Sequence, residues 1–163
     1  MKDEVLESYE NKFKKIKIGD LWVISLSYFK DYAAIGSPHE WDKYNFTHLK
    51  VLIDRNCRIQ KLVDEKGKIP EDKVPNYVSN SLDGYINYVF RSVKCFRDGN
   101  IVGARLEAAG SVPLFLKVIF GLEGRITPYY KYLEWELEKF PLKKFPMTSK
   151  DIIENLLIIL SPI

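Results

Sequence analysis

The residues of this chain that could do chemistry are a few charged side chains set among apolar neighbours. Asp20 is the first of them. In a strand-like segment it falls on the same face as the apolar residues Ile18 and Trp22. A carboxylate in an apolar row is costly unless it is paired, and such residues often act as a base or a metal ligand. The alternative is an aspartate beside Gly19 at a strand edge or bulge, where it faces water.

Charged residues on two predicted helices form a second group of candidates. Arg105 falls on an otherwise apolar helical row, where a guanidinium needs a carboxylate, a carbonyl or a bound anion. Glu107 stands between Gly103 and Gly110, which leave space above it for another helix or a ligand. Such carboxylates would suit a cationic amino sugar and such cations a phosphate, whereas the alternative is a structural ion-pair network between two helices. The candidates in this group are Asp83, Arg91, Lys94, Arg105 and Glu107.

A third group lies in an aromatic segment, residues 127–135. Tyr129 and Tyr130, with Lys131 beside them, could contact a ligand, because aromatic rings with polar tips stack on sugars and bases. The alternative is that they make ordinary half-buried helix contacts. His39 could furnish a metal ligand, although a lone loop histidine is more often part of the polar surface.

Several function classes are excluded by what the sequence lacks. It contains no glycine-rich phosphate loop, no Gly-x-Ser-x-Gly and no Asp-x-Asp, so it is neither a P-loop protein nor a serine hydrolase of that type. Its 25 basic and 22 acidic residues leave a net charge of +3, which is too small for a dedicated nucleic-acid binder. The two cysteines lack zinc-ligand spacing. Without a membrane-length apolar run or a basic leader, the expected location is the cytoplasm.

The elements that must position these residues can be predicted from hydrophobic periodicity. Alternation predicts strands over residues 15–24, 48–54 and 58–63, the last two forming a hairpin. A polar, proline-bearing stretch then separates residues 1–70 from residues 71–163. Helical spacing predicts helices over residues 1–15, 25–35, 82–98, 101–122, 129–140 and 151–160. The expected fold class is α+β, mainly helical, with a small mixed β-sheet followed by an antiparallel helical bundle.

A longer pattern resembles the aminoglycoside nucleotidyltransferase-like superfamily. Residues 83–133 resemble its helical substrate-binding domain, and residues 51–55 resemble the strand that precedes that domain. Residues 19–25 look like the segment that bears the third active-site carboxylate. The resemblance therefore implies that Asp20 is that carboxylate, acting as a base on an acceptor hydroxyl and as a magnesium ligand. The motifs that carry the resemblance include Asp83-Gly84-Tyr85, Arg97-Asp98-Gly99-Asn100, Gly103-Ala104-Arg105, Leu122-Glu123-Gly124 and Pro128-Tyr129-Tyr130-Lys131.

The departure from that family is as informative as the match. Members that transfer a nucleotide begin with a strand-turn-helix bearing Gly-Ser and then Asp-x-Asp, and this chain starts downstream of that segment. The resemblance implies a truncated, split or degenerate member that binds a small polar acceptor and does not transfer nucleotides alone. Mg²⁺ and a nucleoside triphosphate would bind only if the segment were supplied, for example by a partner chain. The alternative is a non-enzymatic helical interaction module that forms a homodimer or binds a partner chain.

Overall fold

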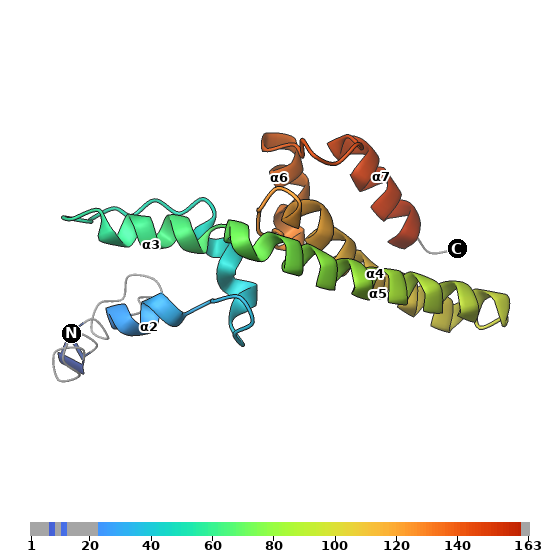
Figure 1. Ribbon diagram of the computed structural model, residues 1–163, viewed down its shortest axis with the longest axis horizontal. Coiled ribbons are helices and arrows are strands. Elements are labelled where there is room, and N and C mark those ends of the chain that lie inside the picture. Colours follow the sequence, from blue (N-terminus) through green and yellow to red (C-terminus); the bar gives the residue numbers. More distant parts are fainter. Residues whose placement is uncertain (1–6, 9–10, 13–22, 161–163) are drawn as a thin grey trace. The chain divides into compact units, whose positions relative to one another are not determined.

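The computed structural model describes residues 7–8, 11–12 and 23–160 of the chain, and helices are the main element within them (Figure 1). The chain divides into two compact units, Met1–Lys43 and Tyr44–Ile163. Residues 44–70 therefore belong to the unit that contains the bundle, whereas sequence analysis grouped them with the first 43 residues. Asp20 and most of the first predicted strand and helix lie outside the described residues.

In the first unit, α2 spans Leu26–Asp31 and starts as the sequence predicts. The Ser25 side chain caps it, accepting a hydrogen bond from the Tyr28 amide at 3.1 Å. The helix ends before residue 35 because Ala33 adopts a positive φ of 54°, which a right-handed helix does not allow. Tyr32 donates a hydrogen bond to Asp42, and this bond, with smaller contributions from burial and charge, raises the pKa of Tyr32 to about 12. A 3₁₀ helix, η1, spans Glu40–Phe46, so its last three residues belong to the second unit.

The predicted hairpin over residues 48–54 and 58–63 is wrong, because the second segment is helix α3, Arg58–Lys66. Ile59, Leu62 and Val63 follow helical spacing, and Val63 is fully buried. Asp54 accepts a hydrogen bond from the Gln60 amide at 2.8 Å, so a side chain from the loop supplies the missing acceptor at the helix start. This contact, chiefly, holds the pKa of the Asp54 carboxyl below its usual range.

The segment before α3 is a loop that α3 itself holds in place. The Gln60 side chain accepts from the Val51 amide at 2.8 Å and donates to the Leu49 carbonyl at 3.3 Å. Leu52 and Ile53 are 96% and 83% exposed, so the apolar alternation buries no sheet face here. Within the described residues the structure has no β-sheet, and Lys68 and Arg125 form an isolated antiparallel bridge.

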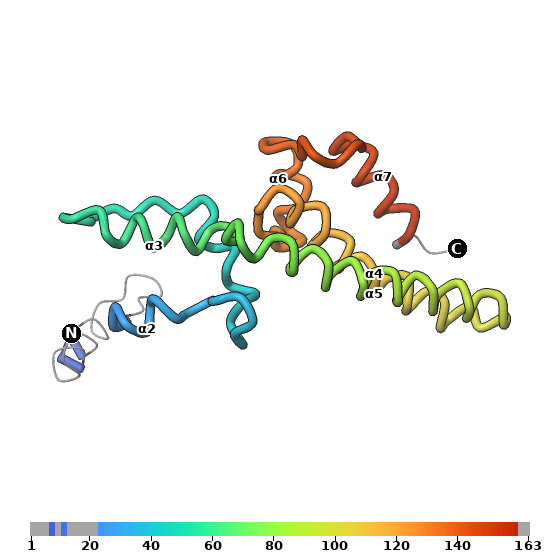
Figure 2. The backbone as a smooth tube through the Cα atoms, in the orientation of Figure 1, coloured from blue at the N-terminus to red at the C-terminus, as the bar shows by residue number. Residues whose placement is uncertain are grey.

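The centre of the second unit is a long hairpin of α4, Val74–Arg97, and α5, Ile101–Gly121 (Figure 2). Gly99 has a φ of 76°, which places it in the left-handed region that ends a helix, as its sequence position predicts. Asn100 caps α5 by accepting from the Gly103 amide at 2.8 Å. The helices approach closely, because a Cβ at Gly110 would lie 2.6 Å from the Tyr88 ring. Pro113 lies inside α5, which continues through it.

Three further elements complete the bundle. They are the 3₁₀ helix η3, Tyr130–Tyr132, then α6, Leu133–Lys139, and α7, Ser149–Leu160. Thr148 and Asp151 exchange hydrogen bonds at the start of α7 and cap it. The core joins α5, α6 and α7 through Leu116, Ile119, Phe120, Leu133, Leu137, Ile152 and Leu156.

The mainly helical character and the helical bundle are confirmed, while the β-sheet part of the expected fold class is not found in the described residues. Helical spacing over long segments is a strong signal because burial must recur every three to four residues. Short apolar runs such as residues 58–63 fit both periods, and only packing selects between them. None of the described helices is long and apolar enough to cross a membrane.

We expect Leu137→Ala to lower the free energy of unfolding by about 2–5 kcal/mol, because the side chain is completely buried and its loss leaves a cavity. Chemical denaturation followed by circular dichroism measures this change. Leu52→Ala is the matched control, since Leu52 is 96% exposed and should change stability by less than about 0.5 kcal/mol. An equal loss in both variants would contradict the described core.

Candidate functional site

The most unusual side chain in the second unit is Glu136, a carboxylate on α6 that is 1% exposed. Three donors surround it. Tyr44 donates its hydroxyl to Oε2 at 2.8 Å, His48 Nε2 lies 2.7 Å from the same oxygen, and Arg125 donates to Oε1 at 2.6 Å. A buried charge is tolerated only when it is paired and hydrogen-bonded, and this one is paired on both oxygens.

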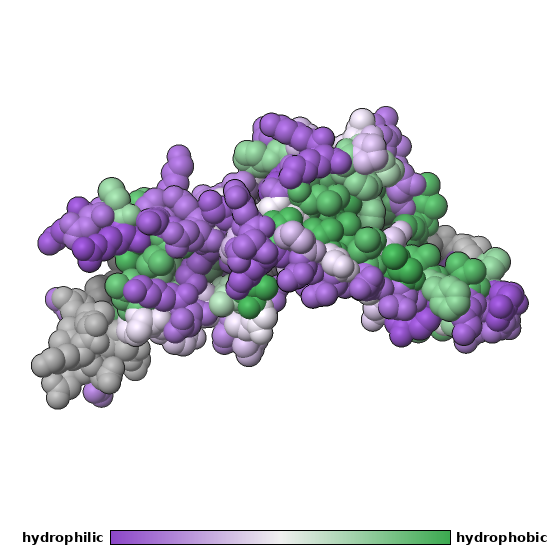
Figure 3. Space-filling model, in the orientation of Figure 1, coloured by the Kyte–Doolittle hydropathy of each residue, from purple (hydrophilic) through white to green (hydrophobic). Residues whose placement is uncertain are grey.

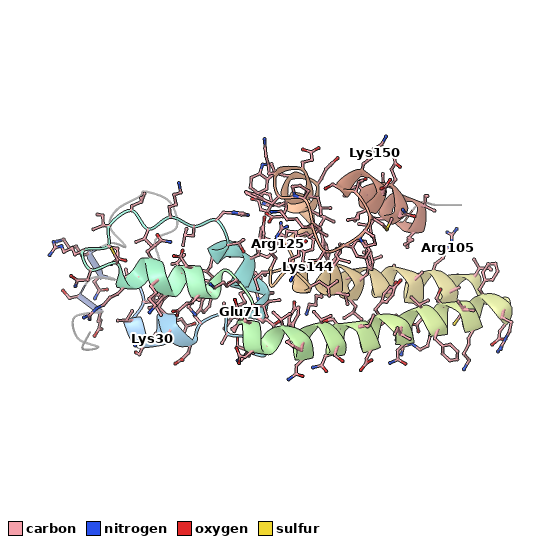
Figure 4. The ribbon with its side chains drawn as sticks, turned by 45° about the horizontal axis from the view of Figure 1, so that its top comes forward. Lys30, Glu71, Arg105, Arg125, Lys144 and Lys150 are labelled. Carbon is pink, nitrogen blue, oxygen red and sulfur yellow. The ribbon has the colours of Figure 1, made fainter. Side chains whose placement is uncertain are left out.

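Arg125 is itself held in several ways. Its second terminal nitrogen donates to the Phe140 carbonyl at 2.7 Å, and its guanidinium lies over the Phe120 ring at 5.0 Å. Glu123 is 3.8 Å from the same group. The backbone bridge between Arg125 and Lys68 fixes the chain from which the side chain extends. Figure 4 labels Arg125 on the segment between α5 and α6, among side chains from these elements. The planar guanidinium therefore reaches Glu136 from a rigid position.

The electrostatics of Glu136 are a balance between burial and hydrogen bonding. Burial disfavours the ionised carboxylate, but the hydrogen bonds from His48, Arg125 and Tyr44 together outweigh it. The pKa of Glu136 consequently lies below its usual value, and the group is ionised at neutral pH. The pKa of the Tyr44 hydroxyl is raised, first by burial and then by its hydrogen bond to Glu136, so Tyr44 stays a proton donor.

His48 connects this charge to the surface. Its ring stacks on Phe140 at a centroid distance of 4.8 Å and meets the edge of Trp135 at 5.5 Å. Its side chain remains 38% exposed. Nε2 faces Glu136, and Nδ1 has no hydrogen-bond partner among the described residues. A carboxylate bonded to one imidazole nitrogen fixes the proton there and leaves the other nitrogen as an acceptor in the neutral ring.

A pocket of about 340 Å³ opens beside this imidazole. Its walls are aromatic and imidazole rings and one side-chain amide. Two of these wall residues, Tyr44 and His48, are hydrogen-bonded to the buried Glu136. The edge of Tyr129 packs on Tyr44 at 5.4 Å and supports that wall. The residues that line the pocket are Tyr44, Asn45, His48, Tyr132 and Trp135.

The charged candidates from the helices are only partly brought together. Arg91 and Glu107 form an ion pair at 3.0 Å between α4 and α5, and Arg91 also lies over the Tyr88 ring. This matches the alternative in which these charges form a structural ion pair between two helices, since the pair links α4 to α5. Arg105 is exposed and points away from α4 (Figure 4), so the predicted need for a buried partner is wrong.

The remaining candidates lie at or near the surface. Asp83 and Lys94 are exposed on α4, and the Lys94 ammonium lies 5.6 Å from the Phe90 ring centre. Tyr130 is 65% exposed, and Lys131 lies over the Tyr132 ring at 4.6 Å. Tyr129 is half-buried against Tyr44. The aromatic segment thus borders the pocket. The predicted residues Tyr129, Tyr130 and Lys131, however, lie beside the residues that line it and do not line it themselves.

Sequence reasoning missed the four residues at the centre of the site. Tyr44 and His48 are 92 and 88 positions from Glu136, so no local pattern links them. Glu136 did carry a signal, because it shares a helical face with Leu133 and Leu137, both of which are buried. A carboxylate on an apolar face is the signal that made Asp20 a candidate, and the same signal is present at Glu136.

Comparisons with known proteins leave the family of this chain open. No protein-family model, curated protein or solved structure matches it. The likeness to nucleotidyltransferases therefore stays a prediction. In the described part of the chain, no group of three or more His, Cys, Asp or Glu side chains is placed to hold a metal ion.

We expect the Glu136 cluster to make stability depend on pH. The folded-state pKa lies below the ordinary value of 4.5, so the contribution is complete above that value and is lost as the pH falls through the folded-state pKa. Urea unfolding at about pH 7 and about pH 3 measures it. Glu136→Gln should lose less stability on acidification than the original chain, because the amide does not titrate. Equal losses in both proteins would contradict an ionised, paired Glu136.

Proposed function

We propose that this chain binds a small hydroxylated acceptor in the aromatic pocket, as the acceptor-binding part of a nucleotidyltransferase-like protein. The observation that supports this most directly is His48, which lines the pocket while the buried Glu136 holds its other nitrogen at 2.7 Å. A pre-oriented imidazole beside aromatic walls is suited to binding a polar molecule in one orientation.

The chemistry of the pocket favours a sugar-like ligand. The rings of Tyr132 and Trp135, which line the pocket, can stack on the apolar face of a sugar. The imidazole Nδ1 of His48 can form a hydrogen bond with a ligand hydroxyl. A ligand ammonium would gain from the aromatic faces. A hydroxylated or amino-bearing acceptor therefore fits better than a purely apolar one.

The proposal of a transfer reaction is supported by the family resemblance alone. The reaction also needs a nucleotide-binding segment that the acceptor pocket does not supply. In this proposal a segment with Gly-Ser and Asp-x-Asp would hold Mg²⁺ and a nucleoside triphosphate. Asp20 would then complete the carboxylate set and accept the proton of the acceptor hydroxyl. The alternative proposal, a protein-interaction module, draws its support from apolar side chains exposed on α4, such as Val93 and Phe96.

We expect isothermal titration calorimetry to detect binding of an amino sugar such as glucosamine, and weaker binding of neutral glucose. Trp135→Ala should weaken it about tenfold, because the stacking wall is lost, and His48→Ala should weaken it by a similar factor. Tyr130→Ala is the matched control, since this exposed ring does not line the pocket. Absence of binding, or an equal loss in the control, would count against the acceptor pocket.

We also expect that the chain alone does not bind a nucleoside triphosphate in a magnesium-dependent way. The reason is that the sequence contains no Asp-x-Asp pair, so neither Gly36-Ser37 nor Gly110-Ser111 is followed by the paired aspartates of nucleotidyltransferases. Calorimetric titration of ATP with and without Mg²⁺ tests this expectation. Tight, magnesium-dependent binding would overturn the proposal that a further segment is needed.

A further inference from the structure

An apolar stripe runs along the exposed side of α4. Its residues recur at spacings of 4, 3, 4 and 3, which is the a and d pattern of a coiled coil. Their exposed fractions, from 36% to 68%, are high for side chains of this kind. The stripe consists of Leu82, Ile86, Val89, Val93 and Phe96.

The stripe borders an apolar cavity between α4, α5 and α7. Val89 and Val93 form one wall of this cavity of about 340 Å³, and α5 and α7 supply the others, including Val112 and Ile159. α7 packs on α5 and α6, which leaves the α4 side of the cavity open. Figure 3 shows hydrophobic side chains gathered along this part of α4, α5 and α7. The bundle thus presents an apolar face that a helix with matching spacing can cover.

We propose that the occupant is α4 of a second copy of this chain, paired antiparallel across a two-fold axis. A stripe with heptad spacing is complementary to itself, and a two-fold axis places the same surface on both partners. In the antiparallel register, Ile86 packs against the second copy's Phe96, and Val89 against the second copy's Val93. Two Val–Val layers then lie at the centre of the interface, with an Ile–Phe layer on either side.

The charges beside the stripe support the antiparallel direction. Asp83, Phe90 and Arg97 follow one another at intervals of seven, all on the same flank of the stripe. In the register above, Asp83 lies beside the second copy's Arg97, and the two Phe90 rings meet at the axis. Arg97 is free to make this contact, because its pairing with Asp98 is exposed and therefore weak. Such flanking pairs set the orientation of coiled coils.

The area of the face fits a stable dimer. At about 150–200 Å² for each fully exposed large apolar side chain, the stripe with Phe90 and Ile101 offers roughly 600 Å² of apolar surface. A standard interface takes about 800 Å² from each partner, and the polar rim supplies the difference. The surface lies on α4 and is separate from the acceptor pocket, so dimerisation and ligand binding are tested independently.

Sedimentation equilibrium on the full chain tests the dimer. We expect the original chain to be a dimer, and Val93→Glu to be a monomer with unchanged helix content by circular dichroism, because the charge would be buried at the interface. Leu106→Glu is the matched control. Leu106 is 69% exposed, but it lies about 200° around α5 from Ala108, which lines the cavity. This variant should remain a dimer.

Charge reversal tests the direction of pairing. Asp83→Arg and Arg97→Asp should each raise the dimer dissociation constant about two- to fivefold, and the double variant should restore it. A monomeric original chain, a dimer unaffected by Val93→Glu, or equal loss in Leu106→Glu would overturn the proposal. Additive loss in the double reversal would overturn the antiparallel register.

Discussion

A buried carboxylate, Glu136, ties together three parts of the second unit. Glu136 is 1% exposed, and its carboxylate is stable there only because Tyr44, His48 and Arg125 all donate to it. These donors come from the end of η1, the following loop and the segment after α5, so the carboxylate joins three parts of the chain. Loss of one donor leaves a buried charge less well paired, which costs far more than the loss of an exposed ion pair.

The same constraint builds the pocket. Because Glu136 holds Nε2 of His48 and Phe140 stacks on its ring, the imidazole presents a defined edge to the pocket. Tyr44 is fixed by its hydroxyl and lines the pocket beside it. Binding of a polar acceptor in this place would need little ordering of side chains, which is the physical reason to favour the pocket over the exposed charges on α4.

The α4–α5 hairpin shows a second principle, in which one helix has two different apolar faces. One face meets α5 through close contacts such as Tyr88 against Gly110, and the Arg91–Glu107 ion pair closes its edge. The other face carries Val93 and is open to solvent. The inner face makes the hairpin stable within one chain, whereas the outer face is suited to pairing between chains.

By itself the sequence determined the local features: helical periodicity in α4, α5 and α7, the caps at Ser25 and Thr148, and the helix end at Gly99. These follow from interactions within a few residues, which is why they could be predicted. It did not determine that residues 58–63 are helical, because a short apolar run fits two periods until packing buries Val63.

Only the tertiary structure decided which residues form the site. Arg105 was expected to need a partner and is solvated instead, and Glu107 is bound to Arg91 across the hairpin. Glu136 gathers Tyr44 and His48 from 92 and 88 positions away. A spacing pattern records which residues share a helix face, but a buried charge is satisfied by whichever donors the fold brings to it. Long-range pairing of this kind follows from packing, which a single sequence does not display.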